Sequence, residues 1–212
     1  MSPFPSRPRG PSWAALRRFT GAVCVMAASL LVSGCLAQKH YVDPALPQVA
    51  IADLKQPEVK HPVQAFIEFQ TNGTTNAKAT EKVAPMIVDT LKKANLFTDV
   101  VVAPATADRK LFITINNVGD LHSAISKGVG TGLTFGLAGN MVTDGYVMKT
   151  AYDVPGIAEV THSYQHALYT TIGNASGPPG LTAVPAEQAV RAVMDGMTLN
   201  LLNDMSKAGE LK

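Results

Sequence analysis

Val63-Gln-Ala-Phe-Ile-Glu-Phe69 has an apolar side chain at every second position from Val63 and predicts a β-strand with one buried face. Successive side chains of a strand point to opposite faces, so residues 63, 65, 67 and 69 would share the buried one. Gln70-Thr-Asn-Gly73 ends the strand with residues that are typical of turns. An apolar face of this kind needs a covering layer, so we expect a helix to pack against it.

An amphipathic helix is predicted directly after this strand and extends to about Ala94. Asn76 can cap its start through a side-chain oxygen. An apolar stripe recurs at spacings of four and three residues: Val83, Ile87, Leu91 and Ala94. Pro85 lies within the stripe, so a helix that starts near Asn76 should be kinked there. A start near Ala84 would instead put Pro85 in the first turn, where proline is tolerated.

The rest of the chain predicts four more strands and a second helix. Asn95 can end the first helix in the left-handed conformation. Strands are predicted at 100–102, 110–118, 145–154 and 160–170, and Pro155-Gly156 predicts a hairpin between the last two. A final helix is predicted from about Pro185 to Ser206. We therefore predict an α+β fold with a mixed or antiparallel sheet of about five strands and two helices packed on one face.

Two segments carry a resemblance to a known domain type. Phe66-Ile-Glu-Phe69 precedes a helix that ends in Leu91-Lys-Lys-Ala-Asn-Leu-Phe97. This order resembles the α/β domains of the TolB amino-terminal type. Similar domains occur in the lipoprotein activators of penicillin-binding proteins and in curli-secretion lipoproteins. The resemblance covers residues 62–205 as topology, and it implies no functional residue.

The N-terminal part of the chain carries an export signal. Four arginines precede an apolar stretch of about 14 residues, Phe19–Val32, and the stretch runs into Leu31-Val-Ser-Gly-Cys35. This motif resembles the lipobox of bacterial lipoproteins. The resemblance implies that residues 1–34 are a signal peptide and that Cys35 receives a diacylglycerol and a further acyl chain such as palmitate. A plain secretory signal or an uncleaved anchor remains an alternative, although a spanning helix needs ~20 residues.

The predicted anchor places the protein at a membrane, facing the periplasm. Leu36 follows Cys35 where an aspartate would retain a lipoprotein in the inner membrane, so the resemblance implies the outer membrane. Prolines at 44, 47, 57 and 62 interrupt the next segment. We therefore predict a lipidated N-terminus and flexible tether over 35–61, and a single domain over 62–212. Val49–Leu54 has enough apolar residues to form a short edge strand instead.

Charge and cysteine content exclude several classes of function. Residues 1–34 contain four arginines and no acid, so their removal leaves 14 basic against 16 acidic side chains, about −2 net. This balance argues against a nucleic-acid partner. Cys24 lies in the signal peptide and Cys35 is the predicted lipid site, so the mature chain has no free thiol. Disulfides, cysteine nucleophiles and cysteine metal sites are therefore excluded.

A glycine-rich insert, residues 124–145, is the candidate interaction segment. Glycine recurs there at every fourth position, and 16 consecutive residues, 128–143, are uncharged. On a helix such a strip lets another helix approach closely. The insert is interpreted as a flap on the sheet, a protein-contact surface or a membrane-inserting element. Its candidate contact residues are Gly128, Gly132, Leu133, Phe135, Gly136 and Leu137.

No catalytic residue, cofactor or metal site is predicted. The common hydrolase motifs are absent from the sequence, and its glycines do not complete a nucleotide-binding pattern. His162 and His166 would lie about 13 Å apart on a strand, too far for one ion. The acids near the insert and the hairpin are typical of turns and caps: Asp120, Asp144, Asp153 and Glu159.

These patterns together predict a protein that works by binding. We expect a lipid-anchored envelope protein that acts non-catalytically as an accessory or assembly factor for a cell-envelope complex. Its expected partners are the membrane, through Cys35, and an envelope protein or further copies of itself. The alternative is a self-assembling membrane or export-pore component that uses the glycine-rich insert.

Overall fold

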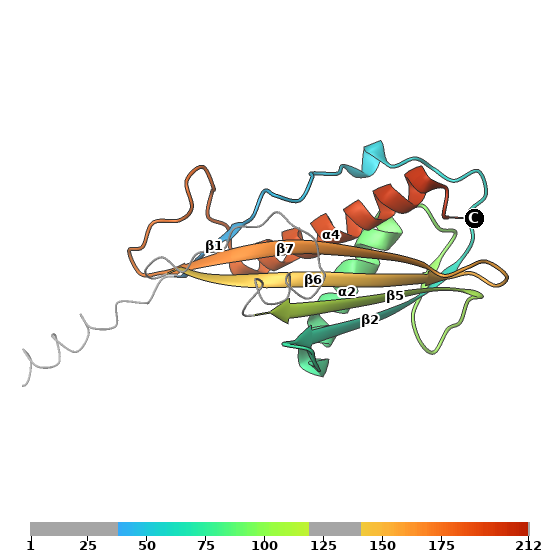
Figure 1. Cartoon of the computed structure of the whole chain (residues 1–212), viewed down its shortest axis with the longest axis horizontal. Helices are drawn as coiled ribbons and strands as arrows, with labels where there is room; N and C mark the ends of the chain where they lie inside the picture. Colours follow the sequence, from blue (N-terminus) through green and yellow to red (C-terminus); the bar gives the residue numbers. More distant parts are fainter. Residues whose placement is uncertain (1–37, 119–140, 212) are drawn as a thin grey trace, which may run out of the picture. The chain divides into compact units, whose positions relative to one another are not determined.

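The computed structural model describes residues 38–118 and 141–211. Over these residues the chain forms one seven-stranded mixed sheet and two α-helices (Figure 1). The sheet order is β1-β7-β6-β5-β2-β3, and β4 also pairs with β2. The strands are β1 (Gln38–Val42), β2 (Val63–Thr71), β3 (Thr74–Thr75), β4 (Val100–Val101), β5 (Arg109–Val118), β6 (Met141–Asp153) and β7 (Val160–Ile172). The helices are α2 (Ala77–Ala94) and α4 (Ala186–Ala208), and η1 (Ile51–Asp53) is a short 3-10 helix.

The predicted α+β class is confirmed, with more strands than expected. β2 runs parallel to β4 and β5, and the other pairs are antiparallel. The five predicted strands correspond to β2, β4, β5, β6 and β7. β3 has only two residues, too few for a visible pattern. β1 buries only Tyr41, so its sequence lacks the alternation that identifies a half-buried strand.

Both helices lie on one face of the sheet and form a single core with it. α2 packs on β2, and α4 packs on β7 and β1. Alternate residues of the central strands face the helices, as the alternation from Val63 to Phe69 predicted. The largest fully buried side chains of this core are Ile87, Leu91, Leu96, Leu111, Ile113, Ile115, Met148, Met194, Met197, Leu201, Leu202 and Met205.

The helix α2 begins at Ala77 and continues through its proline. The Asn76 Oδ1 accepts the main-chain N–H of Ala79 at 3.0 Å, which confirms the predicted cap. Proline has no N–H to bond the main-chain oxygen of the preceding helical turn. Pro85 is exposed, so water can bond that oxygen instead. The alternative start near Ala84 is therefore wrong. Asn95 ends the helix with φ 54°, in the predicted left-handed conformation.

Much of the predicted tether lies on the domain. Residues 38–42 form β1, which pairs with β7 over its whole length. On the other side of β1, Val184 donates its main-chain N–H to His40 O at 2.9 Å. Further along, Leu54 is buried in the core and Asn200 Nδ2 donates to Pro47 O at 2.8 Å. Residues 38–62 therefore do not form a flexible tether: they form the edge strand β1 and a segment that packs on the domain. The alternative prediction of a short edge strand at 49–54 is also wrong, because η1 lies there.

The strand β6 begins earlier than predicted. It starts at Met141, so residues 141–145 of the predicted glycine-rich insert are part of the sheet. The rest of that insert, 124–140, lies outside the described residues. A connection at 154–159 joins β6 to β7, and Gly156 adopts φ 78° there, as the predicted hairpin requires.

Candidate functional site

Most of the residues singled out from the sequence lie outside the part of the chain that the structure describes. Cys35 is one of them. So are the candidate contact residues Gly128, Gly132, Leu133, Phe135, Gly136 and Leu137. Their predicted roles therefore stay predictions. In the described ranges, no helix is long and apolar enough to cross a membrane.

The two histidines of β7 make separate contacts on the helix-covered face. His162 Nε2 lies 2.8 Å from Glu210 Oε2, beyond the end of α4. His166 is buried beneath Gly196, and burial lowers the pKa of its ring. Within residues 38–118 and 141–211, no group of three or more His, Cys, Asp or Glu side chains could hold a metal ion.

The tyrosines of β6 and β7 make contacts within the fold. Tyr164 donates its hydroxyl to Asp204 of α4 at 2.7 Å, and burial raises its pKa. Tyr169 donates to Asp43, which follows β1 and is buried. Tyr146 stands at 62° to Phe69 with ring centroids 6.4 Å apart, and burial raises its pKa to about 12. Tyr164 and Tyr169 therefore join β7 to α4 and to the segment after β1, and Tyr146 packs on β2 within the sheet.

The opposite sheet face carries a stacked, partly exposed aromatic pair on β2 and β5. Phe66 of β2 lies beside Phe112 of β5 in the parallel register. Their ring centroids are 4.8 Å apart, their planes differ by 15°, and 37% and 38% of the two residues is exposed. We call the side around this pair, which carries no helix of the described residues, the open face. Two stacked, half-exposed aromatic rings offer an apolar surface suited to a protein contact.

Charged and polar side chains surround the pair. Glu68 accepts hydrogen bonds from Gln70 at 2.7 Å and from Thr75 at 2.8 Å, and these bonds hold its pKa below the ordinary value. Lys149 of β6 lies opposite Thr114 in the register and is exposed. The open face therefore combines an apolar pair with charged neighbours of both signs.

The sequence alone predicts this surface only in part. Phe66 and Phe112 both occupy the polar phase of their strands, where a large aromatic residue is unusual. That pattern marks each residue as an exposed apolar group. Only the register of β2 on β5 shows that the two rings stack on each other.

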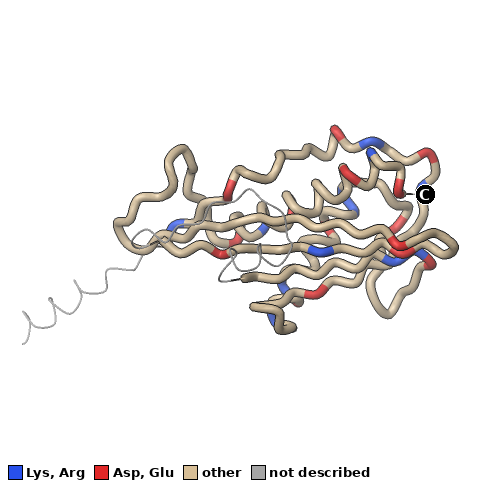
Figure 2. The backbone as a smooth tube through the Cα atoms, in the orientation of Figure 1, with Lys and Arg blue, Asp and Glu red and all other residues tan. Residues whose placement is uncertain are grey.

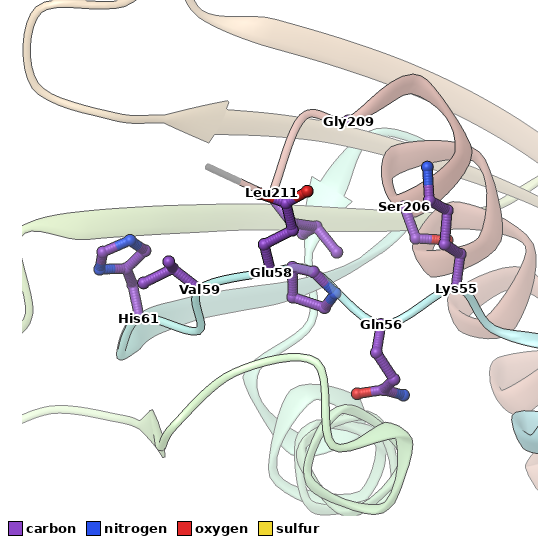
Figure 3. A pocket seen from close by; sticks show the side chains of 9 residues that line it. Lys55, Gln56, Glu58, Val59, His61, Ser206, Gly209 and Leu211 are labelled. Atoms are coloured by element: carbon purple, nitrogen blue, oxygen red, sulfur yellow. The ribbon is translucent and has the colours of Figure 1, made fainter.

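A cavity of about 480 Å³ lies at the end of α4 (Figure 3). The loop of residues 55–61 forms one wall, and Ser206, Gly209 and Leu211 form the other. The Ser206 hydroxyl donates to Asn203 O at 3.0 Å and so stabilises the last turn of the helix. Lys55 and Glu58 add charges of opposite sign to a mostly apolar lining, which also includes the polar side chains of Gln56, His61 and Ser206. This lining holds no hydroxyl that is paired with a general base.

The chain was also compared with known proteins. No protein-family model matches it, and no curated protein matches it. Among solved structures it is similar to the PelC dodecamer from Paraburkholderia phytofirmans, with 16% identity, 79% of this chain and 96% of that chain covered, and a TM-score of 0.35. It is also similar to a putative lipoprotein from Caulobacter crescentus CB15, with 14% identity, 68% and 91% covered, and a TM-score of 0.32. The rare lipoprotein B from Shewanella oneidensis is also similar, with 10% identity, 68% of this chain and 92% of that chain covered, and a TM-score of 0.30. TM-scores this low carry no conclusion about the fold or the function of this chain.

Proposed function

We propose that this chain is a lipid-anchored envelope protein that faces the periplasm at the outer membrane and acts non-catalytically, as an accessory or assembly factor for an envelope complex. The observation that carries the proposal is Leu31-Val-Ser-Gly-Cys35, placed directly after a basic and an apolar segment. Two or more acyl chains on one residue give lasting attachment to a bilayer, whereas a single chain gives marginal attachment.

The open face supports a role in binding. The Phe66 and Phe112 rings are already stacked, so a partner would bury them with little loss of side-chain entropy. Glu68 and Lys149 flank them and would favour a partner surface with matching opposite charges. We assign this face to a folded envelope protein, because a compact aromatic centre with a polar surround is typical of protein contacts.

Lipidation is tested by growing cells with labelled palmitate and recovering the protein. We expect label on the unaltered chain and on Cys24→Ser, and no label on Cys35→Ser. Cys24 is the matched control because it is the only other cysteine of the chain and lies in the predicted signal peptide. Label that persists in Cys35→Ser, or is absent from the unaltered chain, would contradict the proposal.

The binding role is tested by photo-crosslinking in living cells. A photoreactive amino acid at Phe112 should give a discrete adduct with another envelope protein. The same amino acid at Ile157, which is 52% exposed on the β6–β7 hairpin, is the control and should give none. Equal adduct yields at Phe112 and Ile157 would argue against a contact on the open face. So would the absence of adducts both at Phe112 and in a second variant labelled at Phe66.

A second candidate is a self-assembling membrane or export-pore component. The glycines at 128, 132 and 136 favour it, because small residues at every fourth position let helices pack closely. A photoreactive amino acid at Phe135 should then link one copy of the chain to another. A chain that remains a monomer in detergent, with no such adducts, would exclude this candidate.

A further inference from the structure

The predicted lipid site and the folded sheet are joined by a very short piece of chain. Only Leu36 and Ala37 separate Cys35 from Gln38, the first residue of β1. Fully extended chain spans at most ~3.6 Å per residue, so the Cα atoms of Cys35 and Gln38 lie within about 11 Å of each other in any conformation. A lipid on Cys35 would therefore hold the start of β1 close to the bilayer surface.

β1 cannot easily detach to lengthen this connection. All five of its residues pair with β7, from Gln38 opposite Ile172 to Val42 opposite Leu168. Its buried Tyr41 ring packs against Gly177, and Asp43 continues the pairing through its N–H to Ala167 O at 3.1 Å. Releasing β1 would break these bonds and expose an edge of the sheet.

The same end of the sheet brings several segments together. Gln38 pairs with Ile172, and Met141, the first residue of β6, pairs with Thr171. The connection from β7 to α4 leaves the sheet at this end as well (Figure 1). We call this surface, made of residues 38–39, 141–142 and 172–183, the anchor end.

The anchor end carries almost no charge. Between Val160 and Ala186 the chain contains no Asp, Glu, Lys or Arg. Lys39 is the single charged residue of the anchor end, and Val142 is 47% exposed there. The other end of the same strands is rich in charge (Figure 2), with these residues: Lys55, Glu58, Lys60, Asp108, Arg109, Lys110, Asp153 and Glu159.

This asymmetry fits a lipid surface. An uncharged loop loses little hydration free energy when it approaches lipid headgroups, whereas charged side chains of mixed sign would lose more. A lysine near the surface is attracted to anionic lipids. The chain thus has its uncharged surface where the short connection to Cys35 would bring it to the membrane.

We propose that the anchor end rests on the membrane surface, with the loop of residues 173–183 against the lipid headgroups. This inference rests on the proposed lipidation of Cys35. β7 has 13 residues, so its far end would stand about 40 Å from the membrane, at ~3.3 Å per residue. The open face would then lie along the side of the domain, accessible to a periplasmic partner.

The contact is measured with a fluorescent label on the complete lipidated protein. Thr182→Cys places the label in the anchor-end loop, and Ile157→Cys places it on the hairpin at the opposite end; both residues are exposed. The added thiol is the only free one, because Cys35 would be a thioether and Cys24 is removed. The protein is reconstituted in phosphatidylethanolamine–phosphatidylglycerol vesicles that contain lipids with a nitroxide on the headgroup.

We expect the nitroxide to quench the label at Thr182 several-fold more strongly than the label at Ile157. Asn174→Cys is a second exposed position in the same loop and should behave like Thr182→Cys. A flexible Gly-Ser spacer of about 20 residues, inserted between Ala37 and Gln38, should remove the difference, because it lets the domain leave the surface. Circular dichroism should show the same fold for every variant.

Equal quenching at the two ends, or a difference that the spacer does not change, would overturn the proposal. Palmitate labelling of the same protein separates the two levels of inference. Without label on Cys35 the proposed function itself fails. With label present and equal quenching, the anchor is correct and only the orientation is refuted.

Discussion

Single side chains decide how firmly β1 is held on the sheet. The buried ring of Tyr41 fills the space beside Gly177, and Tyr169 donates its hydroxyl to Asp43 just beyond the strand. Gly177 is not in the left-handed region, so another residue could adopt its backbone conformation without strain. A side chain there would instead collide with the Tyr41 ring. The absence of a Cβ at residue 177 is therefore a packing requirement.

Gly177→Ala should destabilise the protein because its new Cβ would overlap the Tyr41 ring. We expect a loss of about 1–3 kcal/mol in the free energy of unfolding, as for other overpacked cores. Urea denaturation followed by circular dichroism measures it, and Ser176→Ala is the exposed neighbouring control. In a Tyr41→Leu background the loss should shrink; a cost that stays the same there would show that the ring is not the obstacle.

His166 should make stability depend on pH. Burial lowers the pKa of its ring, and the charge of Asp43 opposes this effect in part. The unfolded chain therefore binds a proton at a higher pH than the folded chain does, so stability should fall as pH drops below about 6.5. The free energy of unfolding should fall less between pH 7.5 and pH 5 in His166→Gln than in the unaltered protein. Equal slopes for the two proteins in denaturation experiments would contradict this assignment.

At the scale of elements, α2 and α4 are joined by a polar network at their contact. Arg191 of α4 contacts Asp89 of α2, and its Nε donates to Asp195 at 2.9 Å. Thr90 of α2 is buried and donates its hydroxyl to Asp195. On α4, by contrast, the buried hydroxyl of Thr198 has no hydrogen-bond partner within the described residues.

These two threonines should respond to the same substitution in opposite directions. Thr90→Val removes a buried hydrogen bond and should lower the free energy of unfolding by about 1 kcal/mol. Thr198→Val removes an unsatisfied polar atom and should raise it by about 1 kcal/mol. Thermal or urea unfolding of the two variants tests the pair. A loss in Thr198→Val equal to that in Thr90→Val would mean that its hydroxyl has a partner in solution.

For the whole molecule, the described structure includes β1 in the folded body. A shortened chain that begins at residue 62, the predicted domain start, would lack β1 and the buried Leu54. It would expose the outer edge of β7 and part of α4. A chain that begins at residue 38 retains all of these contacts.

We expect the chain that begins at residue 62 to be far less stable than the chain that begins at residue 38, and prone to aggregate. Thermal unfolding and size-exclusion chromatography of the two purified chains make the comparison. A chain that begins at residue 46, after β1 and Asp43, should be intermediate because it retains Leu54 and the Pro47 contact. Equal melting temperatures for all three would mean that residues 38–61 add nothing to the fold.

The sequence by itself determined the local structure and the fold class. The alternation from Val63 to Phe69 and the apolar stripe of α2 both depend on side chains within one element, so they can be read without knowing the neighbours. Asn76 and Asn95 likewise mark the ends of α2 through contacts within a few residues. The lipobox-like motif at Leu31–Cys35, on which the proposed lipidation rests, is a local pattern of the same kind.

Only the tertiary structure decided which distant segments meet. β1 has little apolar alternation of its own and becomes a strand because β7 and Val184 supply hydrogen bonds from more than 100 residues away. The stacking of Phe66 on Phe112 depends on the register of two strands that are joined through α2. Pairing of this kind is a sum of many weak contacts between remote residues, and no short stretch of sequence contains it.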